Sequence, residues 1–323
     1  MTKRALICGI SGQDGGLLAK LLIEKGYQVF GTSRDAEVSR FSNLAHLGIL
    51  DRISTLSMTL TDFRSVLQVL TETKPDEIYN LAGQTSVGLS FAQPVETLES
   101  IAFGTLNLLE VLRFLGGGTK LYNAASSECF GETTLANAAT ETTPFQPRSP
   151  YGVAKATAFW EVANYREAYG LFASSGILFN HESPLRPERF VTRKVVRAAT
   201  RIAAGSDETL KLGALNVVRD WGWAEEYVDA MWRMLQLDHA TDFVVATGQS
   251  HSLEYFVQRC FELLGLDWHD HVQVDQRLMR ATDIGTSYGD PRKAESLLGW
   301  RAKVDFDELL SRLIAAERSI LLA

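Results

Sequence analysis

The sequence predicts an α/β fold in which helices cover both faces of a doubly wound parallel sheet. Two observations support this fold class. Short apolar runs rich in β-branched residues alternate with segments of helical period, and a glycine-rich turn follows the first run at once. This alternation is typical of parallel strands joined by right-handed crossovers. The ligand site of such a sheet lies at the carboxyl ends of its strands.

Six runs in the first part of the chain are expected to form the sheet: Ala5–Ile10, Gln28–Ser33, Ile53–Met58, Glu77–Ala82, Lys120–Ala125 and Ser174–Asn180. Beyond them, the pattern predicts four helices, Val191–Ala204, Glu225–Leu237, Leu253–Leu264 and Phe306–Arg318. It also predicts two short strands, Leu210–Leu212 and Asp242–Thr247. We therefore expect a sheet domain over residues 1–181 and a smaller C-terminal domain over residues 182–323. Segments near residues 220–250 are expected to contribute to the first domain.

Composition excludes several classes of function. The 323 residues are 46% apolar, enough for a large core, and the net charge of −7 without a Lys/Arg cluster argues against nucleic acid as a partner. Cys8, Cys129 and Cys260 are scattered without CxxC spacing, so neither a disulfide framework nor a metal site is expected. The short apolar stretch after Arg4 resembles neither a signal peptide nor a membrane span. We expect a cytoplasmic protein without a membrane partner.

Three glycines between the first strand and the following helix, Leu17–Lys25, predict a dinucleotide site. Gly9, Gly12 and Gly15 have GxxGxxG spacing and enclose Gln13 and Asp14. Such a loop turns tightly and places a pyrophosphate at the helix N-terminus, where free N–H groups and the helix dipole favour anions. Residues 1–181 are therefore expected to form a Rossmann-type dinucleotide-binding domain.

The end of the second strand favours NADP over NAD. NAD-binding proteins commonly have an acidic residue here that accepts hydrogen bonds from the ribose 2′-hydroxyl. This chain has Ser33 followed by Arg34, a pair suited to a 2′-phosphate, although Asp35 is the next residue.

Tyr151 and Lys155 predict a base for a hydroxyl group. They lie four residues apart, hence on one face of a helix that Pro150 begins. We expect the ammonium of Lys155 to lower the pKa of the Tyr151 phenol, so that the phenol takes a proton near neutral pH. Together with the glycine loop, this YxxxK spacing indicates a short-chain dehydrogenase.

Ser126 and Glu128 follow the fifth strand, and Glu128 distinguishes between reactions. The Ser126 hydroxyl can bond the oxygen that is oxidised. A dehydrogenase or epimerase needs no carboxylate here, whereas a sugar 4,6-dehydratase needs one. That enzyme must remove the C5 proton and then protonate the leaving C6 hydroxyl, and one carboxylate can do both.

The chain resembles the GDP-mannose 4,6-dehydratase family of extended short-chain dehydrogenases along nearly its whole length. The segments that carry the resemblance are Gly9–Gly15, Pro75–Ala82, Ser126–Gly131, Pro147–Lys155, Asn164–Gly170, Gly176–Pro184, Phe190–Lys194 and Arg219–Gly222. The Asn-His-Glu-Ser-Pro and Arg-Asp-Trp-Gly stretches within them are more specific than the dehydrogenase core.

This resemblance implies that NADP and a GDP-sugar bind, that GDP-mannose or a close GDP-hexose or heptose becomes the 4-keto-6-deoxy sugar, and that the protein is a homodimer or homotetramer. Tyr151 would act at the C4 hydroxyl with Ser126 and Lys155, and Glu128 at C5 and C6. The remaining residues implied for cofactor are Gly9, Gly12, Gln13, Asp14, Gly15, Ser33, Arg34, Asp62 and Leu81. Those implied for substrate are Ser86, Asn180, Lys194, Arg219, Arg280 and Asp283.

The sequence departs from the family at several of these positions. Ser126 stands where the family has Thr, Arg34-Asp-Ala-Glu37 replaces two arginines followed by serines, and Thr59 replaces an Asp near the adenine. Ala214 and Thr282 change two motifs of the expected substrate pocket. The sequence therefore leaves the identity of the sugar open.

Three alternative functions differ in what they require. A reductase or epimerase of the same fold would have no task for Glu128. A catalytically inactive, nucleotide-sensing relative would not need Ser126, Tyr151 and Lys155 together. A metal-dependent hydrolase would depend on a cluster near the C-terminus, namely Asp267, His269, Asp270 and His271.

Overall fold

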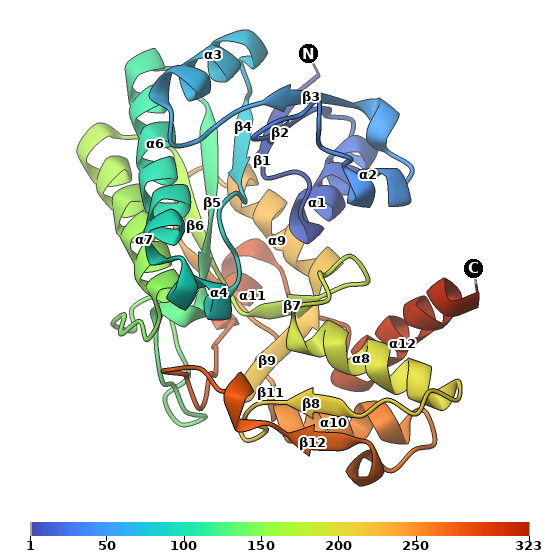
Figure 1. The fold of residues 1–323 in the computed structure, drawn as a ribbon. Coiled ribbons are helices and arrows are strands. Elements are labelled where there is room, and N and C mark those ends of the chain that lie inside the picture. Colours follow the sequence, from blue (N-terminus) through green and yellow to red (C-terminus); the bar gives the residue numbers. More distant parts are fainter. Residues whose placement is uncertain (1, 323) are drawn as a thin grey trace.

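The main sheet has seven strands, and every neighbouring pair in it is parallel. We analysed a computed structural model, which describes residues 2–322. The strand order is β10-β6-β5-β4-β1-β2-β3 (Figure 1). The bounds are β1 (Arg4–Cys8), β2 (Gln28–Ser33), β3 (Ile53–Ser57), β4 (Glu77–Asn80), β5 (Lys120–Ser126), β6 (Ala173–Leu178) and β10 (Phe243–Val245). The chain reverses direction across the sheet between β1 and β4, so the carboxyl ends of these two strands border the crevice where ligands bind in such folds.

Helices cover both faces of this sheet because its strands are apolar on both faces. In β1, Ala5 and Ile7 pack toward one layer of helices, whereas Leu6 and Cys8 pack toward the other. Successive residues of a strand point to opposite faces, so a run without polar positions must be covered twice. One layer holds α1 (Gln13–Glu24), α2 (Ser42–His46), α9 (Ala224–Gln236) and α11 (Arg292–Leu298). The other holds α3 (Phe63–Thr73), α6 (Gly104–Leu115) and α7 (Pro150–Tyr169), preceded by α4 (Val87–Ala92) and α5 (Pro94–Leu98).

A second, smaller core lies beyond the carboxyl ends of the strands. Trp221, Phe256 and Phe306 pack there with residues of α8, which lies against α12 (Figure 1). The helices are α8 (Val191–Ala203), α10 (Leu253–Glu262) and α12 (Phe306–Leu322). The short strands are β7 (Asn180–Glu182), β8 (Leu210–Leu212), β9 (Val218–Trp223), β11 (Ser250–Ser252) and β12 (Val272–Val274). They form a β11-β9-β7 sheet and a β12-β8 pair.

The predicted parallel sheet and its flanking helices are confirmed, with differences at the element ends. The first helix begins at Gln13 rather than at Leu17, directly after the glycine loop. The sixth predicted strand is two strands, because the chain leaves the main sheet at Phe179 and Asn180 begins the pairing of β7 with β9. The β10 strand joins the edge of the main sheet, so a segment from beyond residue 181 completes it.

Asp220 fixes the loop between β10 and β11 through hydrogen bonds to its backbone. Its side chain is fully buried, and its two carboxylate oxygens accept hydrogen bonds from the Thr247 and Gly248 N–H groups at 3.0 and 2.9 Å. Burial raises the pKa of this carboxyl to about 7.

Asp220→Ala is expected to lower the free energy of unfolding by about 1–3 kcal/mol, because two backbone N–H groups lose their acceptors. Chemical denaturation measures this change. Asp270→Ala, at an exposed position, should leave the denaturation midpoint in place. A midpoint equally insensitive to Asp220→Ala would contradict this account of the loop.

Candidate active site

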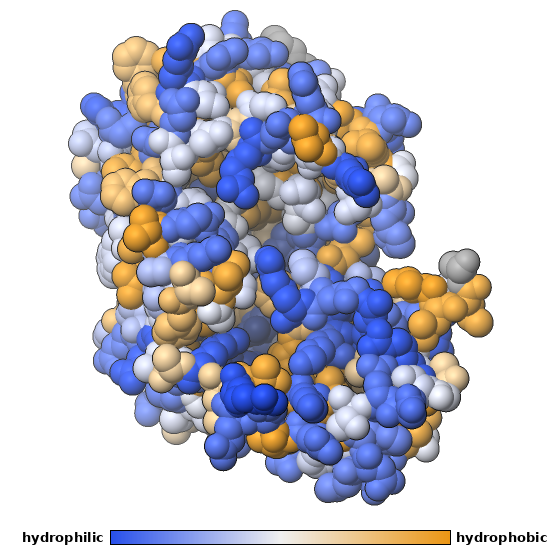
Figure 2. Space-filling view, in the orientation of Figure 1, coloured by the Kyte–Doolittle hydropathy of each residue, from blue (hydrophilic) through white to orange (hydrophobic). Residues whose placement is uncertain are grey.

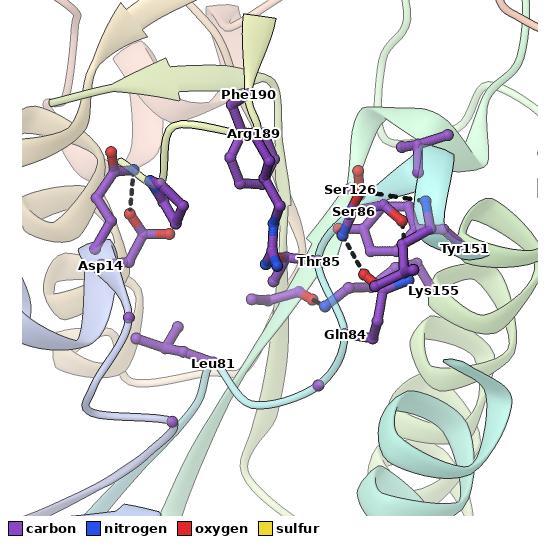
Figure 3. A pocket seen from close by; sticks show the side chains of 18 of the residues that line it. Asp14, Leu81, Gln84, Thr85, Ser86, Ser126, Tyr151, Lys155, Arg189 and Phe190 are labelled. Atoms are coloured by element: carbon purple, nitrogen blue, oxygen red, sulfur yellow. Dashed lines mark hydrogen bonds between the residues drawn. The ribbon is translucent and has the colours of Figure 1, made fainter. Parts of the chain in front are cut away.

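A cavity of about 1450 Å³ opens at the carboxyl ends of β1, β4, β5 and β6 and extends to the start of α8. Figure 2 shows the corresponding hollow between the sheet domain and the smaller domain. In the close view, Asp14 and Leu81 lie at one end of the cavity and Ser126, Tyr151 and Lys155 at the other (Figure 3). The predicted site residues that line it are Gly9, Gly12, Gln13, Asp14, Gly15, Ser33, Arg34, Leu81, Ser86, Ser126, Glu128, Tyr151, Lys155, Asn180, Arg219, Arg280 and Asp283.

The three loop positions hold glycine for different structural reasons. Gly9 has a φ of +81°, and a Cβ there would lie 2.9 Å from Cα of Ala82. A Cβ at Gly15 would lie 2.6 Å from Cα of Ile10. By contrast, a Cβ at Gly12 would meet only the Gly9 carbonyl oxygen, at 3.5 Å, so the protein's own packing does not require a glycine there. The bare backbone of Gly12 instead leaves room for a ligand in the cavity.

The N-terminus of α1 can bind a phosphate group. Gly12 is the cap residue, and no side chain accepts a hydrogen bond from the first turn. The N–H groups of a first helical turn have no partner within the helix, and the helix dipole adds positive potential to them. This turn therefore fits the pyrophosphate of a dinucleotide.

In the loop after β2, the Arg34 side chain is exposed, whereas the Asp35 side chain is hydrogen-bonded to the loop backbone. One carboxylate oxygen of Asp35 accepts hydrogen bonds from the N–H groups of Glu37 and Val38, both at 3.1 Å. The Ser33 hydroxyl donates to the Asp35 carbonyl at 2.8 Å. Arg34 is exposed at the cavity wall. The acidic residue of this loop is therefore bound to its own backbone.

The start of α7 presents Tyr151 to the cavity. Pro150 is in the first helical position, and the Ser149 hydroxyl caps the helix by accepting from the Gly152 N–H at 3.0 Å. Both features favour a helix that begins here. One turn further on, Lys155 is buried and its ammonium donates to the Ala124 carbonyl at 2.7 Å.

The prediction of a lowered pKa for Tyr151 beside Lys155 is wrong, because the pKa of Tyr151 is raised in the folded chain. Burial raises the pKa of Tyr151, opposed by a hydrogen bond with Ser126. Burial also lowers the pKa of Lys155 to about 8. The ammonium lies 5.8 Å from the centroid of the Tyr151 ring and is bound to a carbonyl on β5. Burial therefore outweighs the hydrogen bond with Ser126 in setting the pKa of Tyr151.

Glu128 lies beside Ser126 in a 3₁₀ turn that follows β5. The Ser126 Oγ accepts from the Glu128 N–H at 3.3 Å, which fixes the turn. Burial raises the pKa of the Glu128 carboxyl, while Arg219 and Arg280 lower it. A carboxyl with a raised pKa can both accept and return a proton near neutral pH.

Asp283 holds two arginines at the end of the cavity near Glu128. Its Oδ1 accepts from Arg219 and from Arg280, both at 3.0 Å. Arg219 is 7% exposed, and its place on β9 sets the guanidinium toward the cavity wall. Paired guanidinium groups are suited to a diphosphate.

Several lining residues were missed by the sequence reasoning. Gln84, Thr85, Arg186, Arg189 and Phe190 all contribute to the cavity, and Figure 3 shows Arg189 and Phe190 between its two ends. The positions of these residues in the sequence could have indicated them. The last three follow the Asn-His-Glu-Ser-Pro stretch directly, and the first two follow the end of β4.

Two predicted site residues lie outside the cavity lining. Asp62 caps α3 by accepting from the Arg64 N–H at 3.0 Å. The Lys194 ammonium donates to the Lys211 carbonyl at 2.6 Å on the outer side of α8. Their binding roles stay predictions.

The alternative metal cluster is an exposed turn in which Asp267 accepts from the His269 ring at 2.7 Å. Within residues 2–322, no group of three or more His, Cys, Asp or Glu side chains could hold a metal ion. Over the same residues, no helix has the length and apolar character to cross a membrane.

Comparison with known proteins gives full-length matches. The sequence profile of the family GDP-mannose 4,6 dehydratase matches residues 6–313. GDP-mannose 4,6 dehydratase 1 of Arabidopsis thaliana is 45% identical over 322 residues, covering 97% of this chain and 89% of the relative. The Homo sapiens GDP-mannose 4,6 dehydratase is 42% identical, with 97% and 91% covered. Among solved structures, the NAD complex of UDP-glucose 4-epimerase from Thermus thermophilus is similar at a TM-score of 0.84 and 27% identity, with 98% and 99% covered.

Proposed function

Since this chain belongs to the GDP-mannose 4,6-dehydratase family, we propose that it is an NADP-dependent hydro-lyase that converts GDP-mannose, or a close GDP-hexose or heptose, to the GDP-4-keto-6-deoxy sugar. The observation that carries the proposal is the position of Glu128. Its carboxyl lines the same cavity as Ser126, Tyr151 and Lys155, beside the arginines that would hold the diphosphate.

The residues divide the reaction between them. Tyr151, bonded to Ser126, takes the proton of the C4 hydroxyl. A nicotinamide dinucleotide bound in the cavity would supply the hydride chemistry at C4 and C6. Glu128 then takes the C5 proton, which the C4 carbonyl has made acidic, and gives a proton to the C6 hydroxyl as it leaves as water. A proton returns to C5, so the cofactor is not consumed overall.

Three features support a dinucleotide, and one supports NADP in particular. The bare backbone of Gly12, the uncapped first turn of α1 and the buried ammonium of Lys155 fit pyrophosphate and ribose groups. The Arg34 side chain is exposed at the end of β2, while Asp35 is hydrogen-bonded to its own loop. A 2′-phosphate would therefore meet a guanidinium rather than a carboxylate.

Arg34→Ala is expected to reduce the preference for NADP over NAD by about 1–3 kcal/mol, the scale of a charge-assisted hydrogen bond. Calorimetric titration with each dinucleotide measures the preference. Arg52→Ala, an exposed arginine before β3 that does not line the cavity, serves as the matched control. A wild-type protein that prefers NAD, with Arg34→Ala silent, would show that the cofactor is NAD.

Arg219→Ala is expected to weaken binding of GDP and of the GDP-sugar by at least about tenfold, because the diphosphate loses a buried guanidinium. Arg277→Ala removes another Arg–Asp pair, whose Arg side chain is 83% exposed, and should have no effect. Wild-type protein should also bind GDP more tightly than UDP or dTDP. Equal affinities would remove the GDP assignment and leave the dehydratase assignment intact.

The experiment that tests the whole proposal is incubation with a panel of GDP- and UDP-sugars, followed by mass spectrometry. A dehydratase yields a product lighter than its substrate by one water with only catalytic NADP. A reductase or epimerase of the same fold would instead consume NADPH or leave the mass unchanged, and a nucleotide-sensing protein would show no turnover. The homo-oligomer and the cytoplasmic location stay predictions.

A further inference from the structure

His181 connects the cofactor side of the cavity to its substrate side. Its imidazole is 7% exposed, on β7 directly after the main sheet. Ring atom Nδ1 lies 2.7 Å from the Phe179 carbonyl oxygen, and Nε2 lies 2.9 Å from Oδ2 of Asp14 in the glycine loop. A carbonyl oxygen only accepts, so Nδ1 carries a hydrogen. An ionised Asp14 also only accepts, so Nε2 then carries one as well.

The surroundings of the two side chains favour this doubly protonated ring. The imidazole stacks on Tyr227 with ring centroids 4.5 Å apart. Gln13 donates to the Asp14 carboxylate at 2.9 Å and to the His181 carbonyl at 3.2 Å, and the Ser183 hydroxyl donates to Gln13 at 2.8 Å. Gln13 thus ties the two backbones together independently of charge.

The segment that His181 belongs to also carries the substrate side of the cavity. Glu182 accepts from the Thr192 hydroxyl at 2.6 Å and pairs with Arg186 at 2.9 Å, which links the loop to the first turn of α8. Asn180, Arg186 and Phe190 of this segment line the cavity. A change in how His181 sits on Asp14 therefore moves side chains that face the substrate.

We propose that Asp14 and His181 form a buried ion pair, here termed the Asp14–His181 clasp, in which His181 is an imidazolium and which positions the residue 180–192 segment for GDP-sugar binding. The clasp couples the two ligand sites, because one partner lies in the cofactor loop and the other in the substrate segment. This inference rests on the proposed function for the identity of the ligands, but the charge state of His181 is independent of it.

The clasp has a defined pH range. Asp14 raises the pKa of His181 against the effect of burial, and His181 lowers the pKa of Asp14. The positive charge of Arg186 lowers the pKa of His181, and the Glu182 carboxyl interacts electrostatically with the same ring. Lys155 and Tyr122 interact electrostatically with Asp14, and Tyr227 packs on the His181 ring. A raised pKa of a base gives stabilisation that is complete below the unfolded value and is lost as the pH rises through the folded value. The clasp therefore opens on the alkaline side.

The test begins with nitrogen chemical shifts of the histidine rings in protein without added ligand. At pH 7, His181 should show two protonated nitrogens, with the resonance identified by its loss in His181→Gln. His269, whose exposed ring contacts Asp267 at a similar distance, is the internal comparison. A neutral His181 ring at pH 7 would overturn the proposal, whatever the protein is found to bind.

The functional arm uses Asp14→Asn, which keeps the shape of the side chain and can donate to a neutral imidazole. Titration of GDP into cofactor-free protein should show affinity weakened by about tenfold, although Asp14 lies at the other end of the cavity from the diphosphate-binding arginines. Wild-type affinity should fall as the pH rises through the pKa of His181, and the variant should lack that fall. Asp267→Asn is the matched control and should behave as wild type.

A purely structural role would lower the melting temperature of Asp14→Asn but leave its pH profile for GDP parallel to the wild type, and that result would overturn the proposal. Wild-type protein that binds no GDP, yet has an imidazolium at residue 181, would refute the proposed substrate. The clasp as a charge-bearing contact would then survive, with the ligand to be found by the same titration using other nucleotides.

Discussion

Tyr151→Phe is expected to abolish turnover, lowering kcat by about 10²–10⁴-fold or more while leaving the fold intact. The substitution removes only the phenolic oxygen, which is hydrogen-bonded to Ser126 and is the group that we propose takes the proton of the C4 hydroxyl. Without that step hydride cannot leave C4, so neither reduced cofactor nor dehydrated sugar should form. Rapid-quench mass spectrometry and the absorbance of the reduced nicotinamide measure the two products.

The control is Tyr169→Phe, at the exposed end of the same helix. It should retain wild-type kcat and KM. Reduced nicotinamide formed at the wild-type rate by Tyr151→Phe would transfer the role of base to another group.

The sheet was predictable because its signal is local. The first strand is an apolar run followed by a helix, and the glycine loop marks the first crossover. The small β11-β9-β7 sheet was not predictable in the same way. Its strands β7 and β11, Asn-His-Glu and Ser-His-Ser, have no apolar alternation, and they pair because Asp220 and the second core hold them beside β9.

The position of the candidate catalytic residues was predictable for a similar reason, and their interactions were not. The YxxxK spacing and the carboxyl end of β5 placed Tyr151, Lys155, Ser126 and Glu128 in one cavity. The direction of the Tyr151 pKa shift depends on burial, which no spacing reveals.

Contacts between distant parts of the chain explain the remaining gaps. Asp14 and His181 are 167 positions apart, so nothing in either segment indicates that they meet. Asp62 is different, because an Asp directly before an apolar helical segment is a recognisable N-cap signal. The family resemblance implied a cofactor-binding role for Asp62 and did not point to the cap. Lys194 lies near the start of α8, as predicted. Its side chain is directed toward the Lys211 carbonyl, and this orientation places it outside the cavity lining.

Glu128→Gln is expected to separate the two halves of the reaction. Glutamine keeps the size and polarity of the side chain but cannot accept the C5 proton. Oxidation at C4 should therefore proceed through Tyr151, while elimination of water falls by about 10²–10⁴-fold. The 4-keto sugar and reduced nicotinamide should accumulate in amounts equal to the enzyme, a state that the wild type passes through without accumulation.

The substitution is not expected to destabilise the fold. Burial raises the pKa of Glu128, so its carboxylate is less favourable in the folded chain than in the unfolded chain at pH 7. Replacing it by a neutral amide should leave the melting temperature equal or higher. Loss of activity together with a lower melting temperature would point to damage rather than to a missing acid and base.

Heavy water distinguishes the role of Glu128 from a general effect on rate. Wild-type product should carry solvent deuterium at C5, because the proton that Glu128 removes exchanges before one returns to that carbon. Glu128→Gln should exchange C5 no faster than free substrate does. Dehydration at the wild-type rate by this variant would exclude Glu128 as the acid and base. A wild type that needs NADPH in amounts equal to its substrate would instead favour the reductase, since hydride would then enter the sugar without having left it.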